Sequence, residues 1–361
     1  MSLTLEACSR IVDGEVRLKD VSLTLQAGSL NVLLGPTLSG KTSLMRLMAG
    51  LDRPTAGRLL WNGRDVTGVK VQQRNVAMVY QQFINYPTLT VRQNIASPLK
   101  VAGLPRAEIQ RRVGEAAQLL KLEPLLDRTP LQLSGGQQQR CALARALVKG
   151  AGLVLLDEPL ANLDYKLREE LREELPKIFA AAGSIFVYAT AEPAEALLLG
   201  GCTATLSEGR VTQFGPTVEV YRRPNTLLTA RTFSDPPLNA IAVEKRGAGL
   251  LLPDGAAWPA AGALGALADA GYTLGFRPNH VFLRRPTPGA IALQAQVAVT
   301  EITGSESFVH LDYAGQRWVA LAHGVHELAA GTMTEVFLDP ARFFVFDGAG
   351  GLIAAPAVAG S

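Results

Sequence analysis

The segment GPTLSGKT (35–42) has the residue types and the spacing of a loop that binds phosphate groups. It fits the pattern GxxxxGK[ST], in which small residues allow backbone amides to turn inward around the phosphates. Gly35 and Gly40 supply that freedom, and a helix that starts after the loop would add the positive end of its dipole. Lys41 can bridge the β- and γ-phosphates of a nucleotide, and the Thr42 hydroxyl can bind Mg²⁺. The predicted ATP-binding residues of this loop are Gly35, Pro36, Thr37, Leu38, Ser39, Gly40, Lys41 and Thr42.

A pair of adjacent carboxylates in LLDEP (155–159) supplies the second part of a nucleotide site. Asp157 ends an apolar stretch of strand length, where it is placed to hold Mg²⁺ through water, and Glu158 can polarise an attacking water. Two surface acids at the end of a strand are the alternative, but four apolar residues precede this pair and a phosphate loop lies upstream. We therefore expect Asp157 to be a metal ligand and Glu158 to be catalytic, together with Lys41.

A second glycine-rich segment, LSGGQQQR (133–140), predicts another anion site. Two glycines follow a serine at the start of a helical pattern, so backbone amides would again be free to bind an anion. One bound nucleotide needs only one phosphate cradle. The second cradle is therefore surplus to a single site, and it is the feature that identifies the class of protein.

These segments need a scaffold, and the hydrophobic pattern predicts one. Apolar stretches of strand length occur at 30–34, 153–156 and 184–190, and helical patterns separate them. One such pattern covers 105–120, and another follows the phosphate loop and ends at Gly50, a residue suited to a helix C-terminus. Apolar strands that alternate with helices predict a parallel α/β sheet.

The pattern changes near residues 233–241, where a Pro-Pro pair indicates a linker. Beyond it, short strands alternate in polarity, as in FVHLDYAGQRWVAL (308–321), where two strands flank an Ala-Gly-Gln turn. We therefore predict two domains, an α/β domain over 1–235 and a small antiparallel barrel over 236–361.

The composition fits two soluble domains. The chain has 361 residues, 48% of them hydrophobic, which is enough for packed cores. Its net charge of +3 comes from scattered Lys and Arg, so we expect no nucleic-acid binding. The three cysteines lie far apart and predict no disulfide framework. There is no signal-peptide pattern and no uninterrupted apolar run long enough to span a bilayer, so any membrane association must come through a partner.

The ordered set GPTLSGKT, MVYQQ, LSGGQ, LLDEP and ANLD closely resembles the ATPase domain of ABC transporters, and the resemblance covers roughly residues 3–235. In that family two such domains pair head to tail, so that each nucleotide lies between the P-loop of one subunit and the LSGGQ motif of the other. The resemblance implies an α/β P-loop NTPase fold with a helical subdomain at about 85–150. In that subdomain, FINYPTLTV (83–91) would grip the permease.

The resemblance also implies roles for single residues. The LSGGQ motif would face the γ-phosphate bound by the partner subunit, through Ser134, Gly135, Gly136 and Gln137. Gln81 would sense Mg²⁺ and the permease and take part in catalysis, and Asp164 would link the two sites. The implied metal ligands are Thr42, Gln81 and Asp157.

Three segments near the C-terminus narrow the resemblance, namely GFRPNHVFL (275–283), VTEITGSESFVHLDY (299–313) and VFLDPARFFVFD (336–347). They resemble the OB-like regulatory and dimerisation barrel of importer ATPases for sugars, polyols and glycerol phosphate. Within that branch, GSLNVLLGPTLSGKTSLMRLMAGLDRP and YQQFINYPTLTV look most like one of the paired ATPase subunits of bacterial glycerol importers. The resemblance thus implies ATP hydrolysis coupled to import of a small polyol or sugar-type solute. It favours glycerol over sn-glycerol 3-phosphate or a sugar.

The same resemblance implies the partners and the location of the protein. The partners would be a second ATPase subunit, two transmembrane permease subunits and, indirectly, a periplasmic solute-binding protein. The permease subunits would hold the chain at the cytoplasmic face of the inner membrane. Cargo specificity lies in the permease and the binding protein, so these residues do not name the solute.

The sequence departs from the family in YATAEPAEA (188–196). In the family this segment holds a His-Asp pair whose histidine contacts the γ-phosphate, whereas here Ala191 and Glu192 occupy those positions. No local shift restores the histidine, because all four histidines lie in the C-terminal domain: His280, His310, His323 and His326. Removing one preorganised group that stabilises charge at a reacting centre costs on the order of 10²–10³ in rate. The chain's own site should therefore bind ATP but hydrolyse it slowly.

The LSGGQ motif, which serves the partner's site, is intact, so we interpret the chain as the impaired half of an unequal pair whose other subunit keeps the histidine. A regulatory subunit that binds ATP and hardly hydrolyses it is the alternative. The non-transport ABC ATPases of DNA repair or translation are disfavoured by the permease-gripping segment and the barrel. A second departure is that no aromatic residue occurs in the first 60 residues, so Ile11 or Val12 would have to cover the adenine ring.

Overall fold

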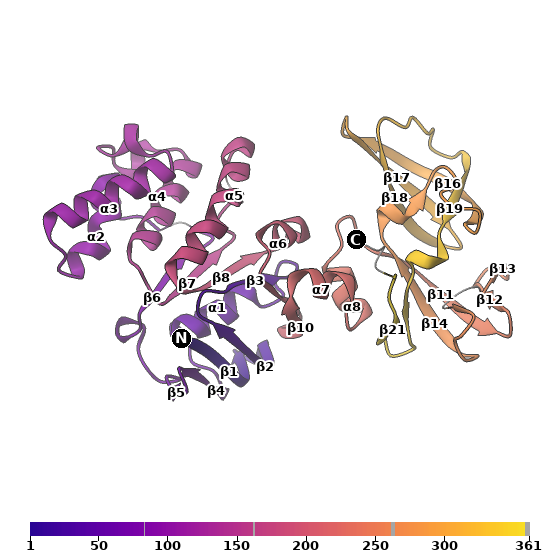
Figure 1. Cartoon of the computed structure of the whole chain (residues 1–361), viewed down its shortest axis with the longest axis horizontal. Helices are drawn as coiled ribbons and strands as arrows, with labels where there is room; N and C mark the ends of the chain where they lie inside the picture. Colours follow the sequence, from indigo (N-terminus) through magenta and orange to yellow (C-terminus); the bar gives the residue numbers. More distant parts are fainter. Residues whose placement is uncertain (83, 162, 261–263, 358–361) are drawn as a thin grey trace. The chain divides into compact units, whose positions relative to one another are not determined.

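The computed structural model divides into two compact units, Met1–Thr217 and Val218–Ser361, whose elements are labelled in Figure 1. The residues that the structure describes are 1–82, 84–161, 163–260 and 264–357. Phe83 of the predicted permease-gripping segment and Asn162 of the ANLD motif lie outside the described residues.

The central sheet of the first unit contains the predicted strands. Its order is β10-β9-β3-β8-β7-β6, and all neighbours are parallel except β10 and β9. Every residue of β3 (Leu30–Leu34), β7 (Leu153–Asp157) and β8 (Ile185–Thr190) is buried, as expected for a parallel sheet. The phosphate loop and the two carboxylates therefore follow strands that end at the same edge. The remaining strands of this sheet are β6 (Val76–Val79), β9 (Cys202–Ser207) and β10 (Arg210–Pro216).

Helix α1 (Lys41–Ala49) shares one core with the central sheet and with a second, antiparallel sheet of order β2-β1-β4-β5. Leu5 and Leu18 of the antiparallel sheet, Met48 of α1 and Leu155 of β7 belong to a single cluster of buried side chains. Because α1 is packed against both sheets, the position of its N-terminus, which adjoins the phosphate loop, is fixed. The strands of the antiparallel sheet are β1 (Ser2–Val12), β2 (Glu15–Gln26), β4 (Ala56–Trp61) and β5 (Arg64–Asp65).

Three helices, α2, α3 and α4, pack on one another and form a group beside β6 of the central sheet, which α4 contacts (Figure 1). A buried side chain, Asn94 of α2, fastens the preceding loop to them by donating to the carbonyls of Tyr86, Leu89 and Thr90 and accepting from the Tyr86 amide. This loop belongs to the segment predicted to grip a permease. The helices of the unit after α1 are α2 (Val91–Val101), α3 (Arg106–Leu119), α4 (Gly135–Val148), α5 (Tyr165–Ala182) and α6 (Pro193–Leu199).

The second unit is built on two antiparallel sheets, of orders β13-β12-β11-β14-β20-β21 and β15-β19-β16-β17-β18. The Trp318 ring packs at 90° to Phe276 with 4.9 Å between centroids, and its Nε1 donates to Ala240 O, which ties the sheets together. The predicted hairpin turns at Ala314 and Gly315, which both have positive φ as a tight two-residue turn requires. The strands are β11 (Asn239–Arg246), β12 (Gly249–Leu251), β13 (Ala257–Pro259), β14 (Gly271–Phe276), β15 (Val281–Phe282), β16 (Ile291–Ile302), β17 (Glu306–Tyr313), β18 (Gln316–His323), β19 (Met333–Leu338), β20 (Phe344–Phe346) and β21 (Leu352–Ala354).

The compact units divide 18 residues before the boundary that the proline pair predicts, since the first unit ends at Thr217 and the predicted domain ends at residue 235. The connecting segment, with α7 (Thr217–Arg222) and α8 (Leu227–Thr232), packs onto the barrel. Arg277 of the barrel is buried there: its guanidinium lies 3.6 Å from the Tyr221 ring centroid and donates to the carbonyls of Tyr221 and Phe233. Burial lowers the pKa of Arg277 to about 10.

Candidate functional site

The phosphate loop joins β3 to α1 through two places where the backbone comes very close to other chain segments. A Cβ on Gly35 would lie 2.5 Å from Leu206 O, and one on Gly40 would lie 3.0 Å from Arg17 O. Gly40, the residue before α1, also has a φ of 105°, which disfavours any side chain. The two glycines of the pattern are therefore required by the packing of the loop as well as by its proposed ligand.

Lys41 is buried, and its Nζ donates to the carbonyl oxygens of Gly35, at 2.6 Å, and Pro36, at 3.0 Å. Burial lowers the pKa of Lys41, and the charges of Glu158 and Asp157 act in the opposite direction. The hydroxyl of Ser39 is also buried and has no hydrogen-bond partner among the described residues. A buried ammonium held by carbonyls alone and an unpaired buried hydroxyl fit a loop whose remaining partner is an anion.

At the end of β7, the buried Asp157 accepts a hydrogen bond of 2.8 Å from the Thr42 hydroxyl through Oδ2. Burial raises the pKa of Asp157, while the Thr42 hydrogen bond and the charge of Lys41 oppose this shift. A carboxylate and a hydroxyl side by side at the start of α1 are hard oxygen ligands of the kind that Mg²⁺ prefers. Two of the three predicted metal ligands, Thr42 and Asp157, therefore lie together.

Glu158 follows with a φ of 46°, a left-handed conformation that is uncommon outside glycine. Its amide donates to Ala189 O at 3.0 Å, and its carboxylate accepts from Gln81 Nε2 at 3.0 Å, so two of the predicted catalytic residues are in direct contact. Gln139 of α4, which sequence reasoning missed, donates to the Glu158 carbonyl at 3.3 Å and is almost fully buried. The only signal for it was its place in the glycine-rich LSGGQQQR segment.

A pocket of about 310 Å³ opens over this arrangement. The predicted residues that line it are Thr37, Leu38, Gly40, Lys41, Thr42, Gln81 and Glu158. Val16 and Arg17 of β2 also line it, whereas Ile11 and Val12, which the sequence suggested for the adenine ring, do not. Ile11 pairs with Val16 across β1 and β2, so a residue predicted to cover the adenine ring lies on the strand next to the one that lines the pocket.

The LSGGQ motif does not line this pocket. Ser134 is the N-cap of α4, where its hydroxyl accepts from the Gln137 amide and its own amide donates to the Gln137 side chain. Ser134 and Gly135 are exposed, so the amide end of α4 is open to solvent and lies outside the chain's own phosphate-loop pocket. Asp164 likewise caps α5 by accepting from the Leu167 amide at 3.0 Å.

Residues 190–192, where the family resemblance implies a histidine, make several contacts within the first unit. The carbonyl of Thr190, the last residue of β8, accepts from the Gly35 amide at 3.3 Å, and Ala191 is exposed. Glu192 turns to α5, where Arg172 lies at 3.1 Å and Arg168 at 3.8 Å. Neither Ala191 nor Glu192 lines the pocket.

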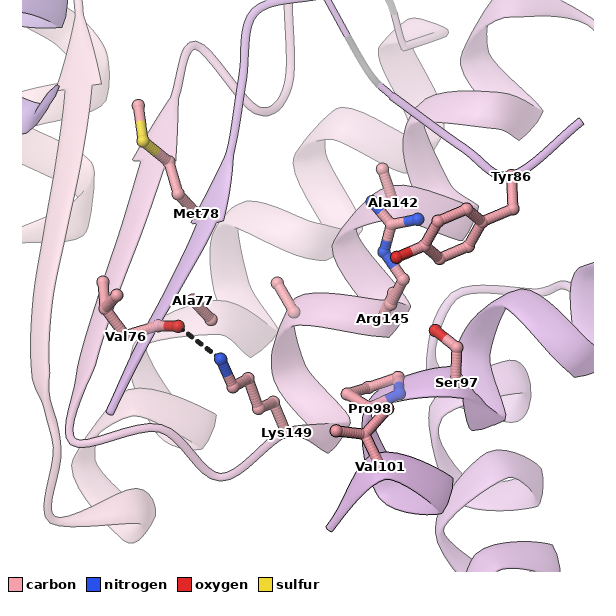
Figure 2. A pocket seen from close by; sticks show the side chains of 11 residues that line it. Val76, Ala77, Met78, Tyr86, Ser97, Pro98, Val101, Ala142, Arg145 and Lys149 are labelled. Carbon is pink, nitrogen blue, oxygen red and sulfur yellow. Dashed lines mark hydrogen bonds between the residues drawn. The ribbon is translucent and has the colours of Figure 1, made fainter. Parts of the chain in front are cut away.

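A second pocket, of about 300 Å³, lies between β6 and helices α2 and α4 (Figure 2). The Tyr86 ring faces the Arg145 guanidinium, which lies 5.0 Å from the ring centroid, and Lys149 donates to Val76 O at 2.6 Å. Val101, which also lines the pocket, is 91% exposed. In the described part of the chain, no helix is long and apolar enough to cross a membrane.

Comparisons with known proteins agree with this geometry. Residues 18–161 match the ABC transporter family, and residues 274–346 match the TOBE domain. The xylose/arabinose import ATP-binding protein of Haloferax volcanii is 38% identical over 96% of this chain and 93% of its own length. The sn-glycerol-3-phosphate import ATP-binding protein of Yersinia enterocolitica is 35% identical over 97% of this chain and 98% of its own length.

Solved structures of ATP-binding cassettes resemble the first unit. A dimeric cassette in a post-hydrolysis state, bound to ADP and Pi, is 28% identical with a TM-score of 0.55, and the match covers 60% of this chain and 98% of that one. These likenesses confirm the predicted fold class, an α/β P-loop ATPase followed by an OB-like barrel.

Proposed function

We propose, from the premise that this chain belongs to the import ATP-binding proteins of the ABC transporter family, that it powers import of a small polyol or sugar-type solute. The observation that carries the proposal is the convergence of the phosphate loop, Gln81 and Glu158 on one pocket, with Asp157 bonded to Thr42 beside it. Phosphate cradle, metal ligands and a base for water are the parts that ATP hydrolysis needs.

The residues present fit ATP and Mg²⁺. Gly35–Thr42 would hold the phosphates, and Thr42, Asp157 and Gln81 would hold the metal, which neutralises charge on the phosphates when bound. Glu158 would accept a proton from the attacking water, and its hydrogen bond with Gln81 orients the carboxylate for this task.

Titration calorimetry with MgATP tests the nucleotide site. Lys41→Ala removes the buried ammonium group that is hydrogen-bonded to the loop carbonyls. The affinity for MgATP should therefore fall severalfold or more. Lys70→Ala, at an exposed lysine of the same unit outside the pocket, is the matched control and should leave affinity unchanged. Equal affinity in the Lys41 variant and the wild type would refute the site assignment.

We further propose that the chain works in a pair. The exposed amide end of α4 at Ser134 and Gly135 lies outside the chain's own pocket, which is expected if it completes a site on another subunit. Similar cassettes are solved as dimers. Because Ala191 replaces a histidine and Glu192 faces α5, the favoured partner is a different ATPase chain that keeps the histidine.

The pocket in Figure 2 is the proposed docking place for a permease subunit. Tyr86 of the segment predicted to grip a permease lines it, and exposed Val101 and Ile84 add apolar surface near the cations Arg145 and Lys149. Two permease subunits would hold the chain at the cytoplasmic face of the inner membrane and receive solute from a periplasmic binding protein.

The solute is proposed as glycerol, with sn-glycerol 3-phosphate or a sugar as the alternatives. The two relatives named above import a pentose and sn-glycerol 3-phosphate, which supports the solute class. Ala191 favours a second candidate function, a regulatory subunit that binds ATP and hardly hydrolyses it. Co-purification of the chain from native membranes, followed by transport assays on the recovered complex with glycerol, sn-glycerol 3-phosphate and pentoses, separates these candidates.

A further inference from the structure

We propose that Glu192 is a positioning residue that holds the chain segment after Glu158 in place through Arg168. The proposal rests on the proposed function, because that segment begins with the residue assigned as the base. Glu192 lies outside the nucleotide pocket and touches none of the residues that would contact ATP. Its effect would therefore be on the placement of the segment and not on nucleotide binding.

The first half of the connection runs from the segment to Arg168. In the first turn of α5, the Nη2 of Arg168 donates to Ala161 O at 3.2 Å and reaches Leu163 O at 3.5 Å. Both carbonyls belong to the turn that follows Glu158, whose own carbonyl accepts from the Ala161 amide at 3.3 Å. Arg168 thus ties this turn to the helix.

The second half runs from Arg168 to β8. Glu192 Oε1 lies 3.8 Å from Arg168 Nη1, while Glu192 Oε2 lies 3.1 Å from Arg172 Nη2. The Glu192 amide donates to the Thr190 hydroxyl at 3.0 Å, which orients the residue at the end of the strand. One carboxylate therefore bridges two arginines on successive turns of α5.

In the described part of the chain, no neighbouring carboxylate of this cluster can take the place of Glu192 as the ion-pair partner of Arg168. Arg172, whose side chain is only 12% exposed, meets three carboxylates, those of Glu169, Glu192 and Glu195. Of these three carboxylates, only Glu192 also forms an ion pair with Arg168 among the described residues. Its removal would leave Arg168 with carbonyl partners alone and would loosen the turn after Glu158.

The consequence is a link between the end of β8 and the segment after Glu158. The link consists only of the protein's own side chains and carbonyls. Since Glu192 is about half exposed, added salt should weaken the connection.

Hydrogen exchange on the full-length chain without nucleotide tests this. Glu192→Gln should make the backbone amides of peptides spanning residues 158–168 exchange about two- to fivefold faster, as expected for loss of an exposed ion pair. High salt should produce the same change in the wild type and add little in the variant. The control is Glu174→Gln, which removes a carboxylate of α5 that pairs only with Lys177 among the described residues and should leave exchange in this region unchanged.

Two results would overturn the proposal. Unchanged exchange at 158–168 in Glu192→Gln would show that Arg168 holds the turn unaided. Faster exchange throughout the first unit would show a general loss of stability and no specific positioning. MgATP affinity, measured in parallel, should be the same in both variants as in the wild type. A wild type that fails to bind MgATP would refute the proposed function, yet it would leave the exchange comparison valid.

Discussion

The ends of β7 and β8 are neighbours, but the acidic residues that they present have different partners. Asp157 on β7 lies beside Ala189 on β8 in parallel register, so both strands deliver acidic residues to the same edge of the sheet. At the end of β7, Glu158 lines the nucleotide pocket and accepts from Gln81, and the buried Asp157 accepts from Thr42 beside the pocket. The carboxylates that follow β8, Glu192 and Glu195, instead pair with Arg172 of α5.

The difference lies in the partners that each carboxylate meets. Glu195 is almost fully buried and accepts from Tyr188, Thr190 and Arg172, so protein donors already occupy both of its oxygens. Asp157 is equally buried but has one hydroxyl partner and a lysine charge nearby, so a metal ion would complete its coordination. Position at the carboxyl edge of a parallel sheet therefore does not by itself make an acidic residue functional.

The largest expected effect concerns the site that this chain would complete on its partner. In the reconstituted transporter, Gly135→Asp would place a carboxylate against the γ-phosphate held by the other subunit and should abolish most hydrolysis and transport. Glu158→Gln disables only the slow site and should cost much less. Steady-state ATPase and transport rates of both variants measure the contrast.

Gly135→Asp should fold normally, because an acidic residue in the first turn of α4 interacts favourably with the helix dipole. Gly114→Asp, in α3 and facing open space, is the matched control and should leave transport intact. If Glu158→Gln is as damaging as Gly135→Asp, both sites turn over and the unequal pair is wrong.

The next effect is on stability. Glu195→Ala leaves Arg172, Tyr188 and Thr190 without their common acceptor, so the free energy of unfolding should fall by about 3 kcal/mol, since Arg172 keeps two other carboxylates. Glu158→Ala should change it by only about 0.5 kcal/mol in either direction, because that side chain faces the open pocket. Urea unfolding of both variants checks the comparison, and equal losses would contradict the separation of roles.

Much of this arrangement follows from local sequence. The apolar stretches predict β3, β7 and β8, and the glycine-lysine pattern predicts the loop between β3 and α1, because these depend on residues close in the chain. The roles of Val16, Arg17 and Gln139 could not be predicted, since each depends on distant segments meeting. Arg17 O reaches the phosphate loop at Gly40, and Gln139 reaches Glu158 from another helix.

A smaller effect should come from restoring the missing side chain. Ala191 is exposed, so histidine can be added there without displacing a packed group. Turnover by the isolated chain should rise by about tenfold, less than the full value of such a group, because Pro193 begins α6 and constrains the backbone that would orient the ring. Single-turnover hydrolysis with MgATP in excess of its Kd is the measurement. Ala194→His, an exposed position on α6, controls for added imidazole. No gain at position 191 would place the defect elsewhere.

The smallest effect is a pH dependence that only the β7 end should show. Burial raises the pKa of Asp157, so the proton competes with a metal ion at higher pH than it would at an exposed aspartate. As pH falls through that raised pKa, the carboxylate becomes neutral, and the part of ATP affinity that depends on Mg²⁺ should decline. ATP affinity measured without Mg²⁺ should change less over the same range. In Asp157→Asn, which cannot titrate, the difference between the two affinities should be small at every pH. A Mg²⁺-dependent affinity that falls equally in wild type and Asp157→Asn would assign the proton to another group and remove Asp157 from the metal site.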